Sequence, residues 1–290
     1  MERCDILIIG AGVAGLAAAE AAWYAGCKNI LLVDRKPGIG GILLQCRHRG
    51  FGPGLDGPEY IAGMTANFPK DIQCLSETTV VSVSETKLAQ LKSPRFGKKT
   101  IRFEQLILAS GCLEIPMGAL PIAGTRPRGV YTAGQMQEMM NLHGFRPEGP
   151  AVILGSGDLG LIMASHLFDA GIPVTAMVEQ KESCGGMARN RQILSQAKIP
   201  LICGNTIAQV LGHPRLEGVI LADGTQLPCQ TLLIAAGLKP DTTLAHALGS
   251  RPWLHLCGNC RRIYPTVEGV IQDGRQAALR AVSALSYHEK

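Results

Sequence analysis

The sequence predicts an α/β fold of two Rossmann-like three-layer domains, with the second domain inserted in the first. The main observation is a glycine fingerprint that occurs twice, as Gly10-Ala-Gly12-Val-Ala-Gly15 and as Gly155-Ser-Gly157-Asp-Leu-Gly160. An acid lies 24 positions after the first glycine of each copy, Asp34 in the first and Glu179 in the second. The C-terminal segment has no acid-tipped strand of its own, so it must complete an earlier sheet.

Each fingerprint has the surroundings that dinucleotide binding requires. The runs CDILIIG and PAVILGSG predict buried parallel strands that lead into the glycines, and a helix is expected to follow. The glycines let the backbone approach a pyrophosphate, and the N–H groups at the helix N-terminus favour negative charge. The acid that ends the next strand can accept hydrogen bonds from an adenosine ribose. The alternative is a Rossmann-like half that has lost its ligand.

The two halves share a longer order of elements. After the acid, the first half continues with the β-rich stretches TTVVSVSETKLAQL and KKTIRFEQ and closes with LILASG. The second half continues with NTIAQVLG and RLEGVILADGTQLPCQ and closes with LLIAAG. Because the closing turns end in small residues, each is expected beside its own nucleotide site. The tail from Trp253, with a helix from about Gly269, is expected to return to the first sheet.

These patterns give the domain boundaries that we expect. The first domain spans residues 1–120 and 245–290, and the inserted domain spans 121–244. Linkers rich in proline and glycine are expected at 116–129 and 240–250.

Composition restricts the function classes. The 290 residues are 46% hydrophobic with 35 glycines, and the net charge of +5 comes without a long Lys/Arg run, so nucleic acid is not an expected partner. The N-terminus enters a strand at once, and the most apolar stretch is broken by the fingerprint glycines and Glu20, so no leader or membrane span is expected. The ten cysteines are mostly single and lie in apolar strands, as in a reducing compartment. A cytoplasmic protein is expected.

Taken together, these residues resemble the two-dinucleotide-binding-domain flavoproteins, the pyridine nucleotide–disulfide oxidoreductase superfamily. The resemblance rests on both fingerprints, on the ASG and AAG turns, and on the late CGN. The motifs GGILLQCRHRGFG, DGPEY, GTRPRGVYTAGQ and GSGDLGLIMA are similar to a bacterial subfamily of FAD/NAD(P)-dependent oxidoreductases. That subfamily is related to anaerobic glycerol-3-phosphate dehydrogenase, hydrogen cyanide synthase, and the flavin subunits of opine oxidase and proline dehydrogenase.

The resemblance implies FAD in the first domain and NAD(H) in the second. NADP is less favoured, since a carboxylate at Glu179 repels a 2′-phosphate. Asn259 replaces the family's usual Asp, and its amide can still hydrogen-bond to the ribityl hydroxyls. No metal is expected. The implied cofactor contacts in the first domain are Gly10, Gly12, Val13, Ala14, Gly15, Asp34, Arg35, Gly40, Gly41, Val81, Ala109, Ser110, Gly111, Gly258 and Asn259. Those in the second domain are Gly155, Gly157, Asp158, Gly160, Glu179 and Gly237.

The family's usual dithiol is missing. After Gly40 and Gly41 the sequence has Cys46 alone, and the stretch VYTAGQMQEMMN before the second fingerprint has no cysteine. Disulfide reduction by the family's ordinary route is therefore disfavoured. Cys257 and Cys260 form a CxxC that permits a redox or metal role. A zinc ion or iron–sulfur cluster needs about four ligands, however, and there is no second CxxC.

Cys46 and His48 are the candidate catalytic residues. They follow the Gly-Gly turn in a segment that the superfamily places across the flavin ring, and an imidazole titrates near neutral pH. The alternative, which we favour, is that both side chains only pack there. Glu114 is interpreted equally well as a solvated loop acid. Met136, Met139 and Met140 recur at helical spacing, which favours packing.

The sequence therefore predicts an FAD enzyme that moves hydride between NAD(H) and flavin without a redox-active disulfide. Its electron acceptor is expected to be a small molecule or a protein. One alternative is a flavin- and nucleotide-binding component of a larger amine, imino-acid or glycerol-3-phosphate dehydrogenase, with NAD or ATP in the second site; its partner would be a second subunit. The other is a redox-sensing flavoprotein without turnover.

Overall fold

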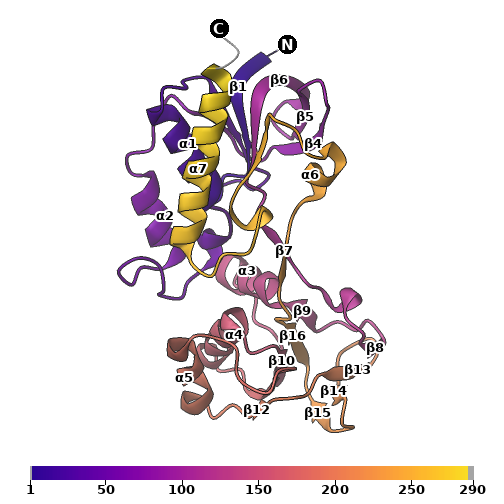
Figure 1. Ribbon diagram of the computed structural model, residues 1–290. Helices are drawn as coiled ribbons and strands as arrows, with labels where there is room; N and C mark the ends of the chain where they lie inside the picture. Colours follow the sequence, from indigo (N-terminus) through magenta and orange to yellow (C-terminus); the bar gives the residue numbers. More distant parts are fainter. Residues whose placement is uncertain (1, 287–290) are drawn as a thin grey trace. The chain divides into compact units, whose positions relative to one another are not determined.

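A computed structural model describes residues 2–286 and divides the chain into two compact units (Figure 1). Unit 1 comprises Met1–Leu113 and Lys239–Lys290, and unit 2 comprises Glu114–Leu238. Both are Rossmann-like and the second is inserted in the first, which confirms the predicted fold class. The first position and the last four positions of the predicted first domain lie outside the described residues. The assignment of one cofactor to each domain stays a prediction.

Unit 1 is built on a mixed sheet. Its strand order is β3-β2-β1-β6-β5-β4, with β18 added beside β6. The strands are β1 (Glu2–Ile9), β2 (Ile30–Val33), β3 (Gln73–Leu75), β4 (Thr79–Val83), β5 (Leu88–Ser93), β6 (Gly97–Leu108) and β18 (Leu254–Leu256). The pairing of β18 with β6 confirms that the tail returns to the first sheet.

The parallel register brings three strand ends together. Ile9 at the end of β1 lies opposite Val33 of β2 and Leu108 of β6. The residues that follow these ends, Gly10, Asp34 and Ala109, therefore meet at one edge of the sheet. This edge holds the first fingerprint.

The helical segments of unit 1 include a closely packed pair, α1 and α7, which lie side by side (Figure 1). A Cβ on Gly274 of α7 would lie 2.3 Å from the carbonyl oxygen of Ala14 in α1, so only glycine allows this approach. Both helices cover one face of the sheet through a shared apolar core. The segments are α1 (Val13–Tyr24), η1 (Gly41–Gln45), α2 (Gly57–Thr65), α6 (Thr243–Leu248), η3 (Gly258–Cys260) and α7 (Val267–Ser286).

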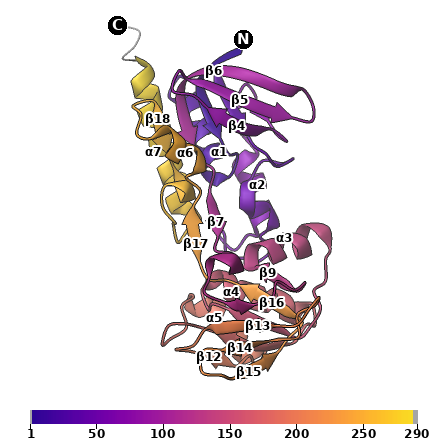
Figure 2. The same ribbon diagram turned by 90° about the vertical axis from the view of Figure 1, so that its right-hand side faces the viewer.

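Unit 2 contains a parallel sheet of order β12-β11-β10-β16-β9 and an antiparallel layer, β15-β14-β13, that β8 joins in parallel (Figure 2). The strands of the parallel sheet are β9 (Val130–Thr132), β10 (Ala151–Leu154), β11 (Val174–Val178), β12 (Leu201–Ile202) and β16 (Thr231–Ile234). The other layer comprises β8 (Ala123–Gly124), β13 (Ile207–Leu211), β14 (Gly218–Leu221) and β15 (Gln226–Pro228). The two stretches that join the units, β7 (Cys112–Glu114) and β17 (Leu238–Pro240), pair with each other.

Two apolar cores lie on the two faces of the parallel sheet in unit 2. One is shared with β13 and β14, and the other with the helices. Met136 is fully buried in the helical core and Met140 packs against it, which confirms the packing predicted for these two methionines. The helical segments are η2 (Met117–Ala119), α3 (Ala133–His143), α4 (Asp158–Asp169) and α5 (Ala188–Gln196).

Within residues 2–286, every helix is too short or too polar to cross a bilayer. The same residues contain no cluster of three His, Cys, Asp or Glu side chains that could hold a metal ion.

Candidate functional site

The three glycines of the first fingerprint differ in whether the surrounding chain would exclude a side chain. Gly10 has φ +103°, and a Cβ there would lie 2.3 Å from the carbonyl oxygen of Ala109. A Cβ on Gly15 would lie 1.8 Å from the carbonyl oxygen of Gly10. Gly12 is not restricted in this way, because the nearest atom to its Cβ position is the Gly41 Cα at 3.8 Å. The chain packs against the first and third glycines and leaves space over the second.

Unit 2 repeats this arrangement. Gly155 has φ +103°, and its Cβ would lie 2.3 Å from the carbonyl oxygen of Ala235. A Cβ on Gly160 would lie 2.3 Å from the carbonyl oxygen of Gly155, whereas nothing lies within 4 Å of a Cβ on Gly157. The two turns thus leave the same position open.

Helices α1 and α4 begin at these open positions. Their N-cap residues are Gly12 and Gly157, and among the described residues no side chain caps either helix. The N–H groups of a first helical turn have no partner within the helix, and they favour an anion. A space that a Cβ would occupy, next to uncapped N–H groups, fits a pyrophosphate in each unit.

Asp34 is the acid of the first site. Its Oδ2 accepts a hydrogen bond from the N–H of Ala11 at 2.6 Å, and its Oδ1 accepts one from the N–H of Lys36 at 2.8 Å. A carboxylate oxygen can accept about two hydrogen bonds, so each oxygen keeps one position. The carboxylate can therefore accept both hydroxyls of a ribose diol.

Glu179 is the acid of the second site and is held more tightly. Its Oε2 accepts from both the N–H of Ser156 at 2.8 Å and the hydroxyl of Ser156 at 2.6 Å, and its Oε1 accepts from the N–H of Lys181 at 3.0 Å. Burial alone would raise the pKa of Glu179, but the hydrogen bonds from Ser156 and Lys181 outweigh it and lower the pKa. The carboxylate is charged at neutral pH and has fewer open acceptor positions than Asp34.

In each unit a pair of adjacent glycines after the acid forms a hydrogen bond to the fingerprint turn. Gly40 donates its N–H to the carbonyl of Ala11 at 2.7 Å, and Gly186 donates its N–H to the carbonyl of Ser156 at 2.9 Å. Both pairs, residues 40–41 and 185–186, lie six and seven positions after the acid. Sequence reasoning named the first pair and missed the second, which this matched spacing could have revealed.

Asp158 ties the loop of the second site to its helix. This first residue of α4 accepts hydrogen bonds at Oδ1 from the N–H of Met187 at 2.8 Å and from Nδ2 of Asn190 at 2.6 Å. The corresponding residue of α1 is Val13, which is buried. The carboxylate of Asp158 thus fixes the start of α5 beside the second turn, a bond with no counterpart in unit 1.

The closing turns lie where the sequence predicts. Ala109 is the residue that Gly10 approaches, and the hydroxyl of Ser110 donates to the carbonyl of Asp241 at 2.8 Å. Gly111 and Gly237 both adopt positive φ, +79° and +118°.

Two predicted contacts on the sheet side of the first site are solvent-exposed. Arg35 is exposed. Val81 is 57% exposed and lies at a register shift of β4. Thr78 is connected directly to the site, because its N–H donates to the carbonyl of Asp34 at 2.8 Å.

A buried carboxylate that pairs with an exposed arginine holds the CGN turn of unit 1. Gly258 has φ +66° and donates its N–H to Oδ2 of Asp273 at 2.8 Å, and Arg261 pairs with Oδ1 of Asp273 at 2.6 Å. Asp273 is only 3% exposed. Sequence reasoning missed Asp273, because an acid in a polar stretch of a helix normally indicates a surface position.

The side chain of Asn259 is oriented by its own loop. Its Oδ1 accepts the N–H of Tyr264 at 3.0 Å, and its Nδ2 points to the Cys112 sulfur at 3.8 Å. The amide therefore keeps one N–H donor and one oxygen acceptor position for a ligand. An aspartate at this position would have no such donor.

The contacts of Cys46 and His48 support the packing interpretation. Cys46 is buried and donates its thiol to the carbonyl of Ile42 at 3.3 Å, and burial raises the pKa of Cys46 to about 12. The thiol is therefore protonated at neutral pH, which makes it a poor nucleophile. The ring of His48 lies 5.1 Å from that of Phe51.

The surroundings of Cys257 and Cys260 support a packing role rather than a redox role. Both are fully buried, and the Cys260 thiol donates to the carbonyl of Leu108 at 2.9 Å. Burial raises the pKa of both thiols. All ten cysteines lie in the described part of the chain, and none is in a disulfide.

Glu114 is a helix cap rather than a solvated acid. Its carboxylate accepts from the hydroxyl of Thr132, from the N–H of Gly134 at 2.6 Å and from the N–H of Gln135 at 3.2 Å. These groups form the N-terminus of α3, where a negative charge is stabilised. The acid thus anchors the start of unit 2 to its own helix.

The chain matches the family described as pyridine nucleotide-disulphide oxidoreductase over residues 4–251, and it belongs to this family. The family's members are FAD- and NAD(P)-dependent oxidoreductases, so the chain is an oxidoreductase of this class. The resemblance drawn from the motifs is confirmed.

Two relatives and one structure show the extent of the similarity. An opine oxidase subunit of Agrobacterium tumefaciens (strain Ach5) is 27% identical over 280 residues, 84% of this chain and 54% of the relative. Hydrogen cyanide synthase subunit HcnB of Pseudomonas protegens is 25% identical over 329 residues, 94% of this chain and 69% of the relative. Thioredoxin reductase of T. acidophilum has a TM-score of 0.77 at 18% identity, covers 98% of this chain and 99% of its own, and shows the fold. The chain spans about half the length of the opine oxidase subunits it matches.

The different environments of the glycines predict different effects of alanine on stability. Gly15→Ala and Gly160→Ala force a Cβ into a backbone carbonyl, and we expect each to lower the free energy of unfolding by at least about 2 kcal/mol. Gly12→Ala and Gly157→Ala meet open space, and we expect changes within about 1 kcal/mol, the size of a cap effect. Urea denaturation of the cofactor-free variants checks this. Equal losses at all four positions would contradict it.

The lowered pKa of Glu179 predicts a pH-dependent contribution to stability. The carboxylate stabilises the folded chain fully above its unfolded pKa of about 4.3, and this contribution is lost as pH falls through the lower folded pKa. Glu179→Gln should therefore be less stable than wild type at pH 7, with the difference shrinking below about pH 4. Urea midpoints measured from pH 7 down to about pH 3 check the prediction. A difference independent of pH would show that the charge is not responsible.

Proposed function

We propose that unit 1 holds FAD, that unit 2 holds NAD(H), and that hydride moves between the two cofactors and on to or from an external partner. The observation that carries the proposal is an arrangement that occurs in both units and that we call the nucleotide cradle. It consists of the fingerprint turn with open space beside its second glycine, Gly12 or Gly157, and of one carboxylate bonded to that turn. When bound, NAD(H) supplies or receives a hydride and FAD stores the electron pair.

Three features of unit 1 support the binding of FAD. The first-turn N–H groups of α1 face the space for the pyrophosphate, and Asp34 has two acceptor positions for the adenosine ribose. The amide of Asn259 keeps one donor and one acceptor position for ribityl hydroxyls. The remaining contacts proposed in this unit are Gly10, Gly12, Val13, Ala14, Gly15, Arg35, Gly40, Gly41, Val81, Ala109, Ser110, Gly111 and Gly258.

The residues of unit 2 fit NAD(H) better than NADP(H). Glu179 is ionised at neutral pH because the hydrogen bonds from Ser156 and Lys181 favour its charged form. A second negative charge, such as a ribose 2′-phosphate, is repelled at this position. The further contacts proposed are Gly155, Gly157, Asp158, Gly160 and Gly237.

The electron acceptor lies outside the chain in this proposal. Cys46 stands alone after Gly40 and Gly41, and Cys257 and Cys260 are fully buried with pKa values raised by burial, so we expect no internal dithiol to pass electrons onward. A small molecule or a protein would take this role.

A second candidate function is supported by the relatives. The opine oxidase and hydrogen cyanide synthase relatives are both named as subunits. In this alternative the chain binds flavin and nucleotide within a larger assembly, and a partner subunit carries the substrate chemistry.

Stopped-flow absorbance of the FAD-loaded protein tests the proposal. We expect NADH to bleach the flavin band rapidly, and NADPH to be slower by about tenfold or more, since Glu179 excludes the 2′-phosphate. Failure of both nucleotides to bleach the flavin would contradict hydride transfer and favour the subunit role.

A matched pair of variants separates the two sites. Gly12→Ala should reduce FAD retention about tenfold or more, because its methyl group occupies the space for the pyrophosphate. Gly157→Ala should retain FAD. It should raise the NADH concentration that gives the half-maximal rate of bleaching by a similar factor. Flavin content after gel filtration and the stopped-flow titration measure the two effects. Loss of FAD in both variants, or in neither, would show that the sites are not assigned correctly.

A further inference from the structure

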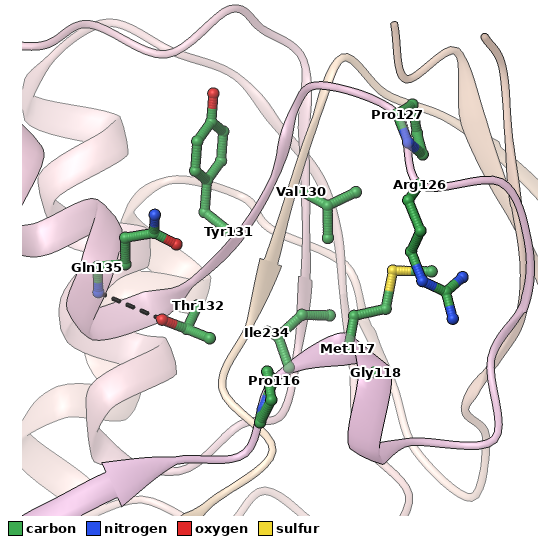
Figure 3. Close-up of a pocket in the computed structure, with 10 residues that line it drawn as sticks. All are labelled: Pro116, Met117, Gly118, Arg126, Pro127, Val130, Tyr131, Thr132, Gln135 and Ile234. Atoms are coloured by element: carbon green, nitrogen blue, oxygen red, sulfur yellow. Dashed lines mark hydrogen bonds between the residues drawn. The ribbon is translucent and has the colours of Figure 1, made fainter. Parts of the chain in front are cut away.

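Unit 2 contains a pocket that the nucleotide cradle does not use. Its volume is about 240 Å³, and it lies beside the carboxyl ends of β9 and β16, whose last residues are Thr132 and Ile234 (Figure 3). None of the cradle residues at 155–160 and none of the side chains around Glu179 lines it. In open α/β sheets, ligands bind outside the carboxyl ends of the strands, so this is a position where a ligand is expected.

The walls of the pocket are mostly apolar. They come from η2, from the loop before β9 and from the two strands, and include Pro116, Met117, Pro127, Val130 and Ile234. Pockets for drug-sized molecules have volumes of roughly 300–1,000 Å³. The smaller volume here suits a body of about one ring.

Arg126 is the one charged side chain that lines the pocket. Its Nη1 donates to the carbonyls of Gly124 at 3.3 Å and Thr125 at 3.2 Å. Within residues 2–286, no carboxylate lies within ion-pair distance of this guanidinium. The backbone thus orients a positive charge that has no counter-ion, and a guanidinium matches the two oxygens of a carboxylate.

The other polar groups leave this charge uncompensated. Tyr131 and Gln135 are neutral. Glu114 accepts a hydrogen bond from Thr132, but it does not line the pocket, and the N–H groups at the start of α3 compensate its charge. The pocket therefore combines apolar walls with a net positive charge.

We propose that this pocket binds a small organic monocarboxylate with an apolar body of about one ring. The carboxylate pairs with Arg126, and the ring packs against Met117, Val130 and Ile234. The lining of this pocket includes none of the residues 155–160, and the proposal does not depend on the proposed hydride transfer.

Isothermal titration of the full-length, FAD-loaded protein with benzoate tests the site, with benzyl alcohol as the neutral probe of similar shape. We expect benzoate to bind about fivefold more tightly than benzyl alcohol, the ratio that an exposed ion pair provides. Arg126→Gln should abolish this preference. Arg128→Gln, which removes the same charge from an exposed residue outside the pocket lining, should retain it.

A variant that fills the pocket tests independently whether the probes bind there. A Cβ on Gly118, which lines the pocket, would meet no atom within 4 Å, so the first carbon of a larger side chain fits there, and Gly118→Leu adds bulk at the pocket wall. It should weaken both probes, and circular dichroism confirms that the variant is folded.

Three results would overturn the proposal: no saturable binding of benzoate, equal affinity for the two probes, or a preference that survives Arg126→Gln. Competitive displacement of benzoate by NAD⁺ would also overturn it, because the probe would then occupy the nucleotide cradle.

Discussion

Each unit depends on the close approach of a helix to the turn that precedes it. In unit 1 the backbone of Gly15 passes so near the carbonyl of Gly10 that no side chain fits between them, and Gly160 and Gly155 repeat this contact in unit 2. The approach places the first helical turn directly over the ends of the central strands. The N–H groups, the acid of the neighbouring strand and the returning glycine loop consequently meet at one place.

The same architecture supports two sites with different properties. Asp34 receives backbone N–H groups and keeps both oxygens available for a ribose. Glu179 receives an additional hydroxyl from Ser156, and that hydroxyl in turn accepts the N–H of Gly185 at 2.9 Å. The second site is therefore the more rigid of the two, with its acid, turn and loop joined through one serine. Ala11 at the corresponding position of unit 1 has no hydroxyl to do this.

Features that repeat at fixed spacing could be predicted from the sequence alone. The two fingerprints, the acids 24 positions later and the return of the tail to β6 follow from local patterns, and the family match agrees with them. Asp273 and Glu114 could not be recognised, because their partners are set by tertiary structure: a turn 15 residues away in one case, and the start of α3 in the other. An acid carries no sign in the sequence of whether it will be buried against such a partner.

The central claim is that one chain provides two separate sites for adenine dinucleotides. Native mass spectrometry of the full chain, incubated with FAD and NAD⁺ together, tests it most directly. The account predicts a dominant species that carries one FAD and one NAD⁺, with neither displacing the other. A chain that takes up a single dinucleotide, whichever is supplied in excess, would contradict it.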